Sequence, residues 1–372
     1  MSNHIELIES IASGVTAHHA DSVDNGQFPQ ATVDALSEAG LLGLISAPEV
    51  GGLGQGPRAA AEVVERLARE CASSAMVICM HYAGTAVIEQ HGDEATRKAI
   101  ASGQHLSTLA FSEAGSRSHF WAPLSTATPT DNGVQLNAQK SWVTSASHAT
   151  AYVWSSQSID AEGPSTIWLV PSNADGLTRH GPFTGLGMRG NDSTPVQAEN
   201  VTVPASAQLG EDGAGFGIMM EVVLPWFQVM NAACSIGLME GATQRACLHA
   251  SGAKYAHLEQ AALADLPTIR NYLARMRVKT DMARGLWLDT LTAMETGRED
   301  AMLRVLESKA AAGETATEVL DIAMRVCGGA AFRNDVGVER YFRDGRANTV
   351  MAPTTDVLYD FIGKAICGQD LF

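Results

Sequence analysis

The spacing of apolar residues changes twice along the chain, and no other feature constrains its fold as strongly. Residues 1–106 carry apolar side chains at helical intervals, as amphipathic helices do. In residues 107–213 apolar and polar residues alternate in short runs separated by turn residues, which indicates strands. Helical spacing returns over residues 214–372. The sequence therefore predicts three domains with these bounds, of which the outer two are helical and the middle one is built from strands.

The middle segment predicts a small antiparallel sheet or barrel, because its alternating runs are short and close together. These runs are 134–137, 141–144, 151–154, 166–170 and 196–201. In the last segment helical spacing is interrupted around Pro225, Pro267 and Gly328, residue types that end or restart helices. We expect an α+β multidomain fold.

The charge of the chain argues against nucleic acid and anionic membranes as main partners. It has 25 Lys and Arg against 41 Asp and Glu, a net charge of −16 at pH 7, and no dense basic block. No run approaches the ~18 apolar residues that a membrane span needs, and the first residues lack a signal-peptide pattern. We expect a soluble, cytoplasmic protein.

The six cysteines show neither a C-x-x-C pair nor a His/Cys spacing typical of zinc. Their apolar, mostly helical surroundings predict buried free thiols. We expect no metal site.

Five segments carry a resemblance to a known family. Residues 327–332 (Cys-Gly-Gly-Ala-Ala-Phe), with 339–346 and 352–355, resemble the C-terminal signature of the acyl-CoA dehydrogenase family of flavoproteins. Further motifs of that family resemble four upstream segments in the same order: 48–54, 109–118, 140–145, and the group 187–190, 201–204 and 209–216. On these matches the chain is identified as a member of the family.

The resemblance implies an N-terminal helical domain, a middle antiparallel β-barrel domain and a C-terminal four-helix bundle. It also implies FAD between the β-domain and the C-terminal helices. The implied partners are an acyl thioester of coenzyme A or a carrier protein, an electron acceptor such as an electron-transfer flavoprotein or oxygen, and further copies of the chain in a dimer or tetramer.

The same resemblance implies cofactor contacts in the middle domain. Ser112 and Thr144 supply hydroxyl groups to the flavin edge, and Trp142 stacks on its ring. Ser118 lies where the family contacts cofactor phosphate or the pantetheine arm. The alternative is that Trp142 is a barrel core residue and Thr144 an ordinary strand threonine. Phe111 completes this set of expected contacts.

Further cofactor contacts are implied near the C-terminus. Gly328 and Gly329 resemble a glycine pair that lets another subunit's backbone approach the cofactor diphosphate, which requires the absence of a Cβ. The alternative is a plain helix break. Arg325 replaces the family's glutamine and is our candidate for balancing the diphosphate charge, because the family's R-x-x-F-G arginine aligns with 254–259, which has Lys254 and His257 instead. Thr354 is expected at the flavin.

The chain departs from the family at its catalytic base. The family's glutamate falls on Ala352, whose methyl group cannot accept a proton. An earlier position used by some members falls on Phe227. We take Asp356 and His119 as candidate catalytic residues; their alternatives are a first-turn acid that favours the helix dipole and a packing or solvated histidine. Glu113 and Asp344 are expected to be structural, Asp344 as a buried salt-bridge partner.

The leading functional hypothesis is an FAD-dependent dehydrogenase that oxidises the α,β C–C bond of an acyl thioester. A flavin monooxygenase or N-hydroxylase on the same scaffold is the second, because it needs no base for the α-proton. The third is a non-catalytic partner subunit of a hetero-oligomer.

Overall fold

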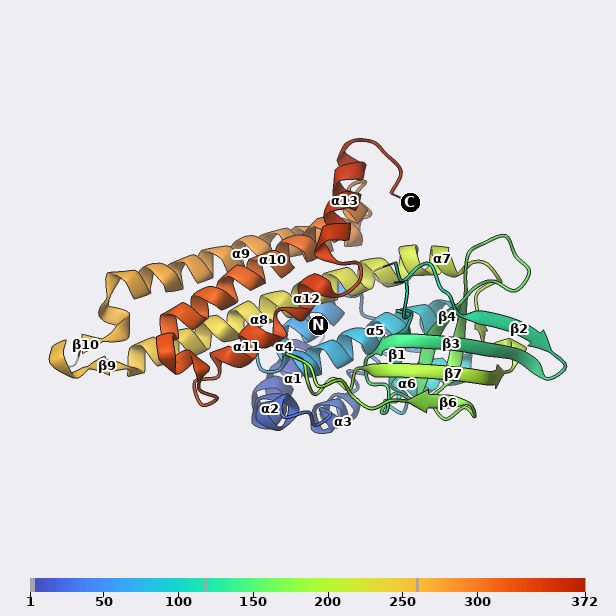
Figure 1. Ribbon diagram of the computed structural model, residues 1–372, viewed down its shortest axis with the longest axis horizontal. Helices are drawn as coiled ribbons and strands as arrows, with labels where there is room; N and C mark the ends of the chain where they lie inside the picture. Colours follow the sequence, from blue (N-terminus) through green and yellow to red (C-terminus); the bar gives the residue numbers. More distant parts are fainter. Residues whose placement is uncertain (1–3, 117–118, 259–260, 372) are drawn as a thin grey trace.

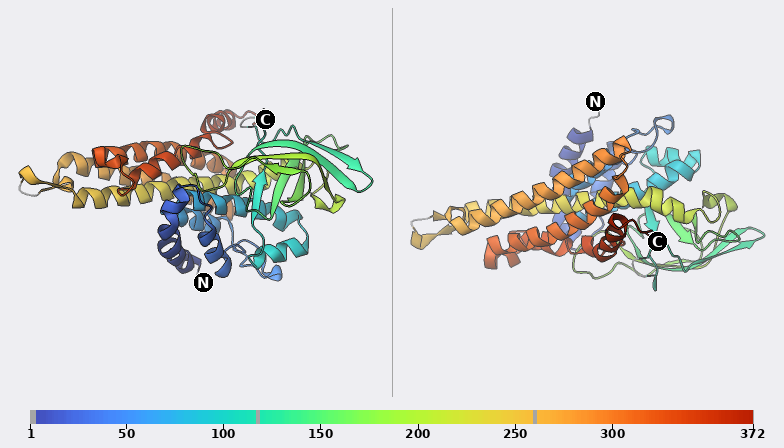
Figure 2. Two further views of the ribbon diagram at one scale, coloured as in Figure 1. Left: turned by 60° about the horizontal axis from the view of Figure 1, so that its bottom comes forward. Right: turned by 90° about the horizontal axis from the view of Figure 1, so that it is seen from above.

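A computed structural model describes residues 4–116, 119–258 and 261–371. Helices of the N-terminal part lie beside two sheets, and a set of long helices extends away from those sheets (Figures 1 and 2). The succession of helices, strands and helices predicted from the sequence is confirmed.

The N-terminal part consists of short helices packed around one buried helix. The elements are α1 (His4–Ile11), α2 (Ala17–Asp24), α3 (Gln30–Glu38), α4 (Pro57–Ala68), α5 (Ala72–His91) and α6 (Glu94–Ala101), with a π-helical turn at Ala12–Thr16. α5 is apolar on all sides and almost wholly buried. Local signals set the helix starts: Pro57 is at the first position of α4, and Asp93 caps α6 by accepting from Thr96 N at 2.7 Å.

The middle part forms two four-stranded sheets. Their strands are β1 (Ser107–Ala110), β2 (Thr126–Thr130), β3 (Gly133–Val143), β4 (Ala151–Ser156), β5 (Thr166–Pro171), β6 (Leu177–Arg179), β7 (Thr194–Val203) and β8 (Gln208–Leu209). One sheet has the order β1-β4-β5-β8 and the other β2-β3-β7-β6. The large side chains of Tyr152, Trp154 and Trp168 are fully buried in the middle part.

The expectation of one antiparallel sheet or barrel needs two corrections. The strands form two separate sheets, and β1 pairs with β4 in parallel, with Ser107 opposite Ala151. The other pairs of these sheets are antiparallel. The chain leaves β1 to build β2 and β3 in the other sheet and then returns, and a long crossover of this kind allows parallel pairing.

The C-terminal part is built on three long helices. The elements are α7 (Gly215–Ile218), a π-helical turn (Met219–Val223), α8 (Leu224–Gly252), the short pair β9 (Lys254–Tyr255) and β10 (Ala261–Ala262), α9 (Pro267–Thr296), α10 (Ala301–Cys327), α11 (Val338–Asp344), α12 (Ala347–Val350) and α13 (Thr355–Ile366). α8, α9 and α10 pack along one another (Figure 2).

The predicted interruptions of this part have different outcomes. Pro267 begins α9 and Gly328 ends α10 at a φ of 57°. Pro225 interrupts nothing, because the π-helical turn that precedes it relieves the missing hydrogen bond and the helical path continues.

The helical path Gly215–Gly252 is long and apolar enough to cross a membrane by length and composition alone, which the sequence analysis did not anticipate. Its most apolar window has a mean hydropathy of 1.5, and 94% of that window is buried inside the fold. It is therefore the core helix of this structure.

The cysteines are all free, but not all are buried as expected. Cys247 is half-buried and Cys367 is exposed, because each lies near the end of a helix.

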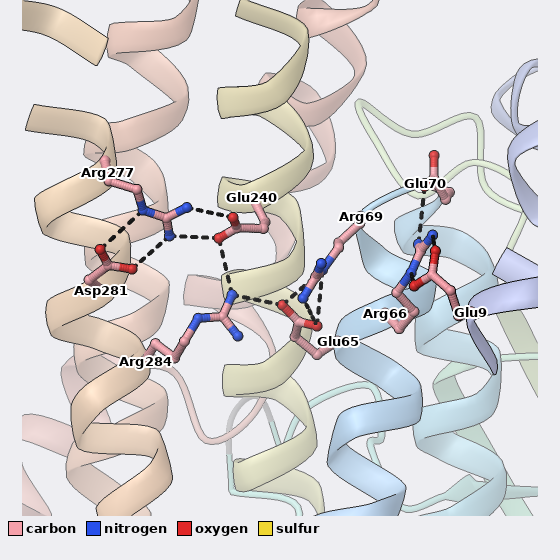
Figure 3. Close-up of polar contacts among 9 residues, drawn as sticks. All are labelled: Glu9, Glu65, Arg66, Arg69, Glu70, Glu240, Arg277, Asp281 and Arg284. Atoms are coloured by element: carbon pink, nitrogen blue, oxygen red, sulfur yellow. Dashed lines mark hydrogen bonds and ion pairs between the residues drawn. The ribbon is translucent and has the colours of Figure 1, made fainter. Parts of the chain in front are cut away.

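A network of charged residues joins the N-terminal part to the bundle (Figure 3). Glu65 on α4 is buried and accepts from Arg69 Nη2 at 2.9 Å. Arg284 on α9 donates through Nη2 to Glu65 at 2.9 Å and to Glu240 on α8 at 3.1 Å. One guanidinium group thus connects three helices.

A second connection links the bundle to the middle part. Asp344 at the end of α11 is buried, and its Oδ1 accepts from Met188 N at 2.6 Å. The expected salt bridge of Asp344 is absent among the described residues, because Arg343 pairs with Asp24 and Glu339 instead. Burial raises the pKa of the Asp344 carboxyl from 3.8 to about 6.

We predict that Arg284→Gln lowers the free energy of unfolding by about 2 kcal/mol, because it leaves the buried Glu65 carboxylate with one partner fewer. Urea unfolding measures the change. Arg275→Gln on the same helix is the matched control, since Arg275 is exposed and has no carboxylate partner among the described residues. Equal stabilities of the two variants would show that the network contributes nothing.

We predict that Asp344→Asn removes one component of the pH dependence of stability. The folded state holds the Asp344 proton more tightly than the unfolded state, so protonation stabilises the fold below about pH 4. This contribution, about 3 kcal/mol, disappears as the pH rises through about 6. Urea unfolding between pH 4 and pH 7 should therefore show a variant-minus-parent difference that changes with pH. Parallel curves would contradict the buried, protonatable Asp344.

Candidate active site

A cavity of about 880 Å³ lies where the three parts of the chain meet. α5 contributes Met76 and Met80 to its wall, and the start of α8 contributes Leu224 and Phe227. β1, β3 and the loops that follow them form a second side, and the segment from α11 to residue 354 closes a third. A mostly apolar hollow with a few polar groups is the usual form of a small-molecule site.

Five of the predicted cofactor contacts line this cavity: Phe111, Ser112, Trp142, Thr144 and Thr354. They come from segments far apart in the sequence, which the fold brings onto one surface.

Trp142 is an exposed residue of the cavity wall. Its side chain is 58% exposed, and its ring lies 4.0 Å from that of Phe183 at 35°. The alternative that it fills the core of the β-domain is therefore wrong. An open indole face beside hydroxyl groups matches what a flat, polar-edged ring requires.

Hydroxyl groups lie next to this indole. Thr144 follows β3 directly, and its Oγ1 is 3.2 Å from Ser193 Oγ. Ser112 O accepts from Ser141 N at 2.9 Å, which holds the loop after β1 against β3. The donor set, the exposed ring and the apolar wall together fit an isoalloxazine.

The remaining predicted cofactor contacts lie elsewhere or cannot be placed. Arg325, Gly328 and Gly329 are at the C-terminal end of α10. That end of the helix points away from the sheets (Figure 1). Arg325 Nη2 donates to Tyr272 Oη at 2.8 Å, and a Cβ at either glycine would meet no atom within 4 Å. Their approach to another subunit's cofactor stays a prediction. Ser118 lies outside the described residues.

Ala352 and Phe227, the two positions where the sequence resemblance places the family's catalytic glutamate, both line the cavity. Glu113 is the one carboxylate among the described lining residues. Its Oε1 accepts from Lys140 Nζ at 2.5 Å and from Ser125 Oγ, while Oε2 accepts from Leu124 N at 2.6 Å. Glu113 is thus structural, as expected, and the described wall presents no free carboxylate.

The segment around Ala352 is held from behind by a lysine that the sequence analysis missed. Lys309 on α10 is fully buried, and its Nζ donates to Met351 O at 2.9 Å and to Pro353 O at 2.7 Å. Burial lowers the pKa of this ammonium group to about 7. The sequence feature that could have indicated its burial is the apolar run 310–312, which directly follows this lysine on a helix.

The two candidate catalytic residues lie together but outside this cavity. His119 and Asp356 line a second cavity of about 560 Å³ beside α13. Asp356 is in the first turn of α13, where a carboxylate favours the helix dipole. Their assignment as catalytic residues stays a prediction, and the geometry of the larger cavity does not support it.

Comparison with known proteins covers nearly the whole chain. The family models described as "Acyl-CoA dehydrogenase, N-terminal domain", "middle domain" and "C-terminal domain" match residues 5–103, 108–201 and 213–367. The probable acyl-CoA dehydrogenase YngJ of Bacillus subtilis is 26% identical over 361 residues, which cover 95% of this chain and 94% of the relative.

Two solved structures share the fold. Butyryl-CoA dehydrogenase from Megasphaera elsdenii superposes with a TM-score of 0.91 at 22% identity, over 98% of this chain and 97% of that one. The prolyl acyl carrier protein oxidase AnaB superposes with a TM-score of 0.88 at 19% identity, over 98% and 99%. With all three family models matched in order, the chain belongs to the acyl-CoA dehydrogenase family of FAD-dependent oxidoreductases.

Proposed function

We propose that this protein oxidises the α,β C–C bond of an acyl thioester bound in the 880 Å³ cavity, with FAD as its cofactor. The observation that carries the proposal is the make-up of that cavity. One side presents the exposed indole of Trp142 with the hydroxyl groups of Ser112 and Thr144. The other side is an apolar wall suited to an acyl chain.

Each side of the cavity has its own task. FAD, when bound, accepts the hydride that leaves the β-carbon. Trp142 would hold the flavin ring, and Ser112 and Thr144 would bind its polar edge. The apolar side chains of Met76, Met80 and Phe227 would pack on the acyl chain and exclude water from it.

The proposal includes a second copy of the chain. Arg325, Gly328 and Gly329 lie at the end of α10, and none of them lines the cavity. This position supports the family expectation that they serve the cofactor diphosphate of a neighbour in a dimer or tetramer.

The carrier of the acyl group is left open between coenzyme A and a carrier protein. Likeness to butyryl-CoA dehydrogenase supports the first and likeness to the carrier-protein oxidase AnaB supports the second. The electron acceptor is proposed to be an electron-transfer flavoprotein or oxygen.

A specific observation also favours a second function. No free carboxylate lines the described part of the cavity, and a missing base costs a dehydrogenation ~10²–10⁴-fold. A flavin monooxygenase reaction at the same site needs no base for the α-proton. It is therefore our alternative.

Anaerobic titration of the flavin-loaded protein with acyl thioesters separates the two functions. Loss of the flavin absorption on adding a thioester supports the dehydrogenase. If the absorption persists, and the substrate gains oxygen when free reduced flavin and air are supplied, the alternative replaces it. A protein that binds no flavin overturns both.

We predict that Ala352→Glu accelerates flavin reduction by an acyl thioester by about 10²-fold or more, because it places a proton acceptor in the cavity wall. Stopped-flow absorbance measures the rate. Ala352→Gln is the control, since it has the same length but takes no proton. If both variants react at the same rate, lack of a carboxylate at residue 352 does not limit the reaction.

Asp356→Asn and His119→Gln test the predicted catalytic residues. If either side chain is the base, its loss should slow flavin reduction ~10²–10⁴-fold without changing the flavin content. Because both line the second cavity, an unchanged rate in both variants would remove them as candidates and leave Asp356 as a residue that stabilises α13.

A further inference from the structure

Four ionisable side chains line the larger cavity within the described part of the chain: Glu113, Arg189, Arg343 and Arg346. Two of them are already neutralised. Glu113 pairs with Lys140, and Arg343 pairs with Asp24 and Glu339. The charge that remains available to a ligand therefore belongs to the other two arginines.

Arg346 has no carboxylate within 4 Å among the described residues. Its guanidinium group lies over the ring of Phe342 at 4.6 Å, and its side chain is half-buried. Arg189 is more exposed, and the one hydrogen bond described for its guanidinium group goes to Gly185 O at 3.3 Å. Although the chain has 41 acidic residues against 25 basic ones, neither of these two cavity arginines has a carboxylate partner among the described residues.

An unpaired, partly desolvated guanidinium group is a strong site for an oxyanion. Its planar fork matches a carboxylate with two parallel hydrogen bonds. The contact with the Phe342 ring stabilises the charge of this group and uses none of its N–H donors in a hydrogen bond.

The position of Arg346 indicates which part of the substrate it meets. Arg346 lies six residues before Ala352, with the short helix α12 (Ala347–Val350) between them, and both residues line the same cavity. The sequence resemblance places the catalytic base, and with it the reacting carbon, at residue 352. We therefore assign Arg346 to the acyl end of the ligand. Neither phosphate group is expected at Arg346. The phosphate of a carrier lies at the far end of the long pantetheine arm, and the cofactor diphosphate is proposed to lie against Arg325 of a second copy.

We infer that Arg346, assisted by Arg189 at the rim, binds a carboxylate on the acyl group, so that the substrate is the thioester of a dicarboxylic acid. The inference rests on the proposed function, since it presumes an acyl thioester in this cavity. It adds a substrate class and the residue that selects it.

The test compares two thioesters that differ only in this charge. Succinyl-pantetheine and butyryl-pantetheine both have four-carbon acyl groups on an uncharged carrier, and butyryl-4′-phosphopantetheine adds the carrier phosphate. Calorimetry on the flavin-loaded protein measures their dissociation constants. The variants are Arg346→Gln, Arg346→Lys and, as a control, Arg275→Gln, which removes an exposed arginine outside the cavity.

We expect Arg346→Gln to weaken succinyl-pantetheine binding about 10- to 100-fold and to leave butyryl-pantetheine binding unchanged. Arg346→Lys should restore part of the affinity, and Arg275→Gln should change neither thioester. Flavin content and thermal unfolding should match those of the parent protein, which separates a lost contact from a damaged fold.

Three outcomes would overturn the inference. They are equal losses for the succinyl and butyryl thioesters, a loss confined to the phosphopantetheine thioester, and failure of the parent protein to bind succinyl-pantetheine. If butyryl-pantetheine still binds in that last case, the proposed function stands without the carboxylate. If no thioester binds, the proposed function fails as well.

Discussion

The buried ion pair between Glu113 and Lys140 fixes the wall on which the cofactor contacts stand. Both side chains are almost completely inaccessible, and Lys140 Nζ donates also to Ser155 O at 2.7 Å. Burial lowers the pKa of this lysine to about 8, opposed by the charge of Glu113. Removing either partner would leave the other charged in the core, which typically costs about 3–5 kcal/mol. Ser112 on one side of the pair and Trp142 on the other therefore keep their relative positions.

The opposite wall is held in a defined shape around Ala352, one of the positions where the sequence resemblance places the family's glutamate. Lys309 still holds the carbonyl groups on both sides of Ala352, and Asn348 Nδ2 donates to Ser235 Oγ at 2.7 Å beneath the same segment. These contacts fix the backbone around Ala352 in the cavity wall. Among the described charged residues that line the cavity, Arg189 and Arg346 are the two without an ion-pair partner.

Much of the fold and part of the site could be predicted from local sequence. The change of periodicity near residues 107 and 214 separated helices from strands, since it depends only on neighbouring residues. Five residues that the motifs predicted as cofactor contacts line one cavity, and their role stays a prediction: Phe111, Ser112, Trp142, Thr144 and Thr354. The parallel pairing of β1 with β4 was missed, because strand direction in a sheet depends on where the chain travels between the strands.

The sequence by itself determined the order of helices and strands and the family, and it predicted two positions for the family's glutamate, which hold Ala352 and Phe227. Only the tertiary structure decided which charges are satisfied. Arg343 is neutralised by Asp24, 319 residues away, whereas Arg346, three residues further on, has no such partner among the described residues. The energy of an ion pair depends on the distance between its charged atoms and on how far burial lowers the local dielectric constant. The sequence alone does not contain these distances, so the most informative residue of the cavity became visible only in the folded chain.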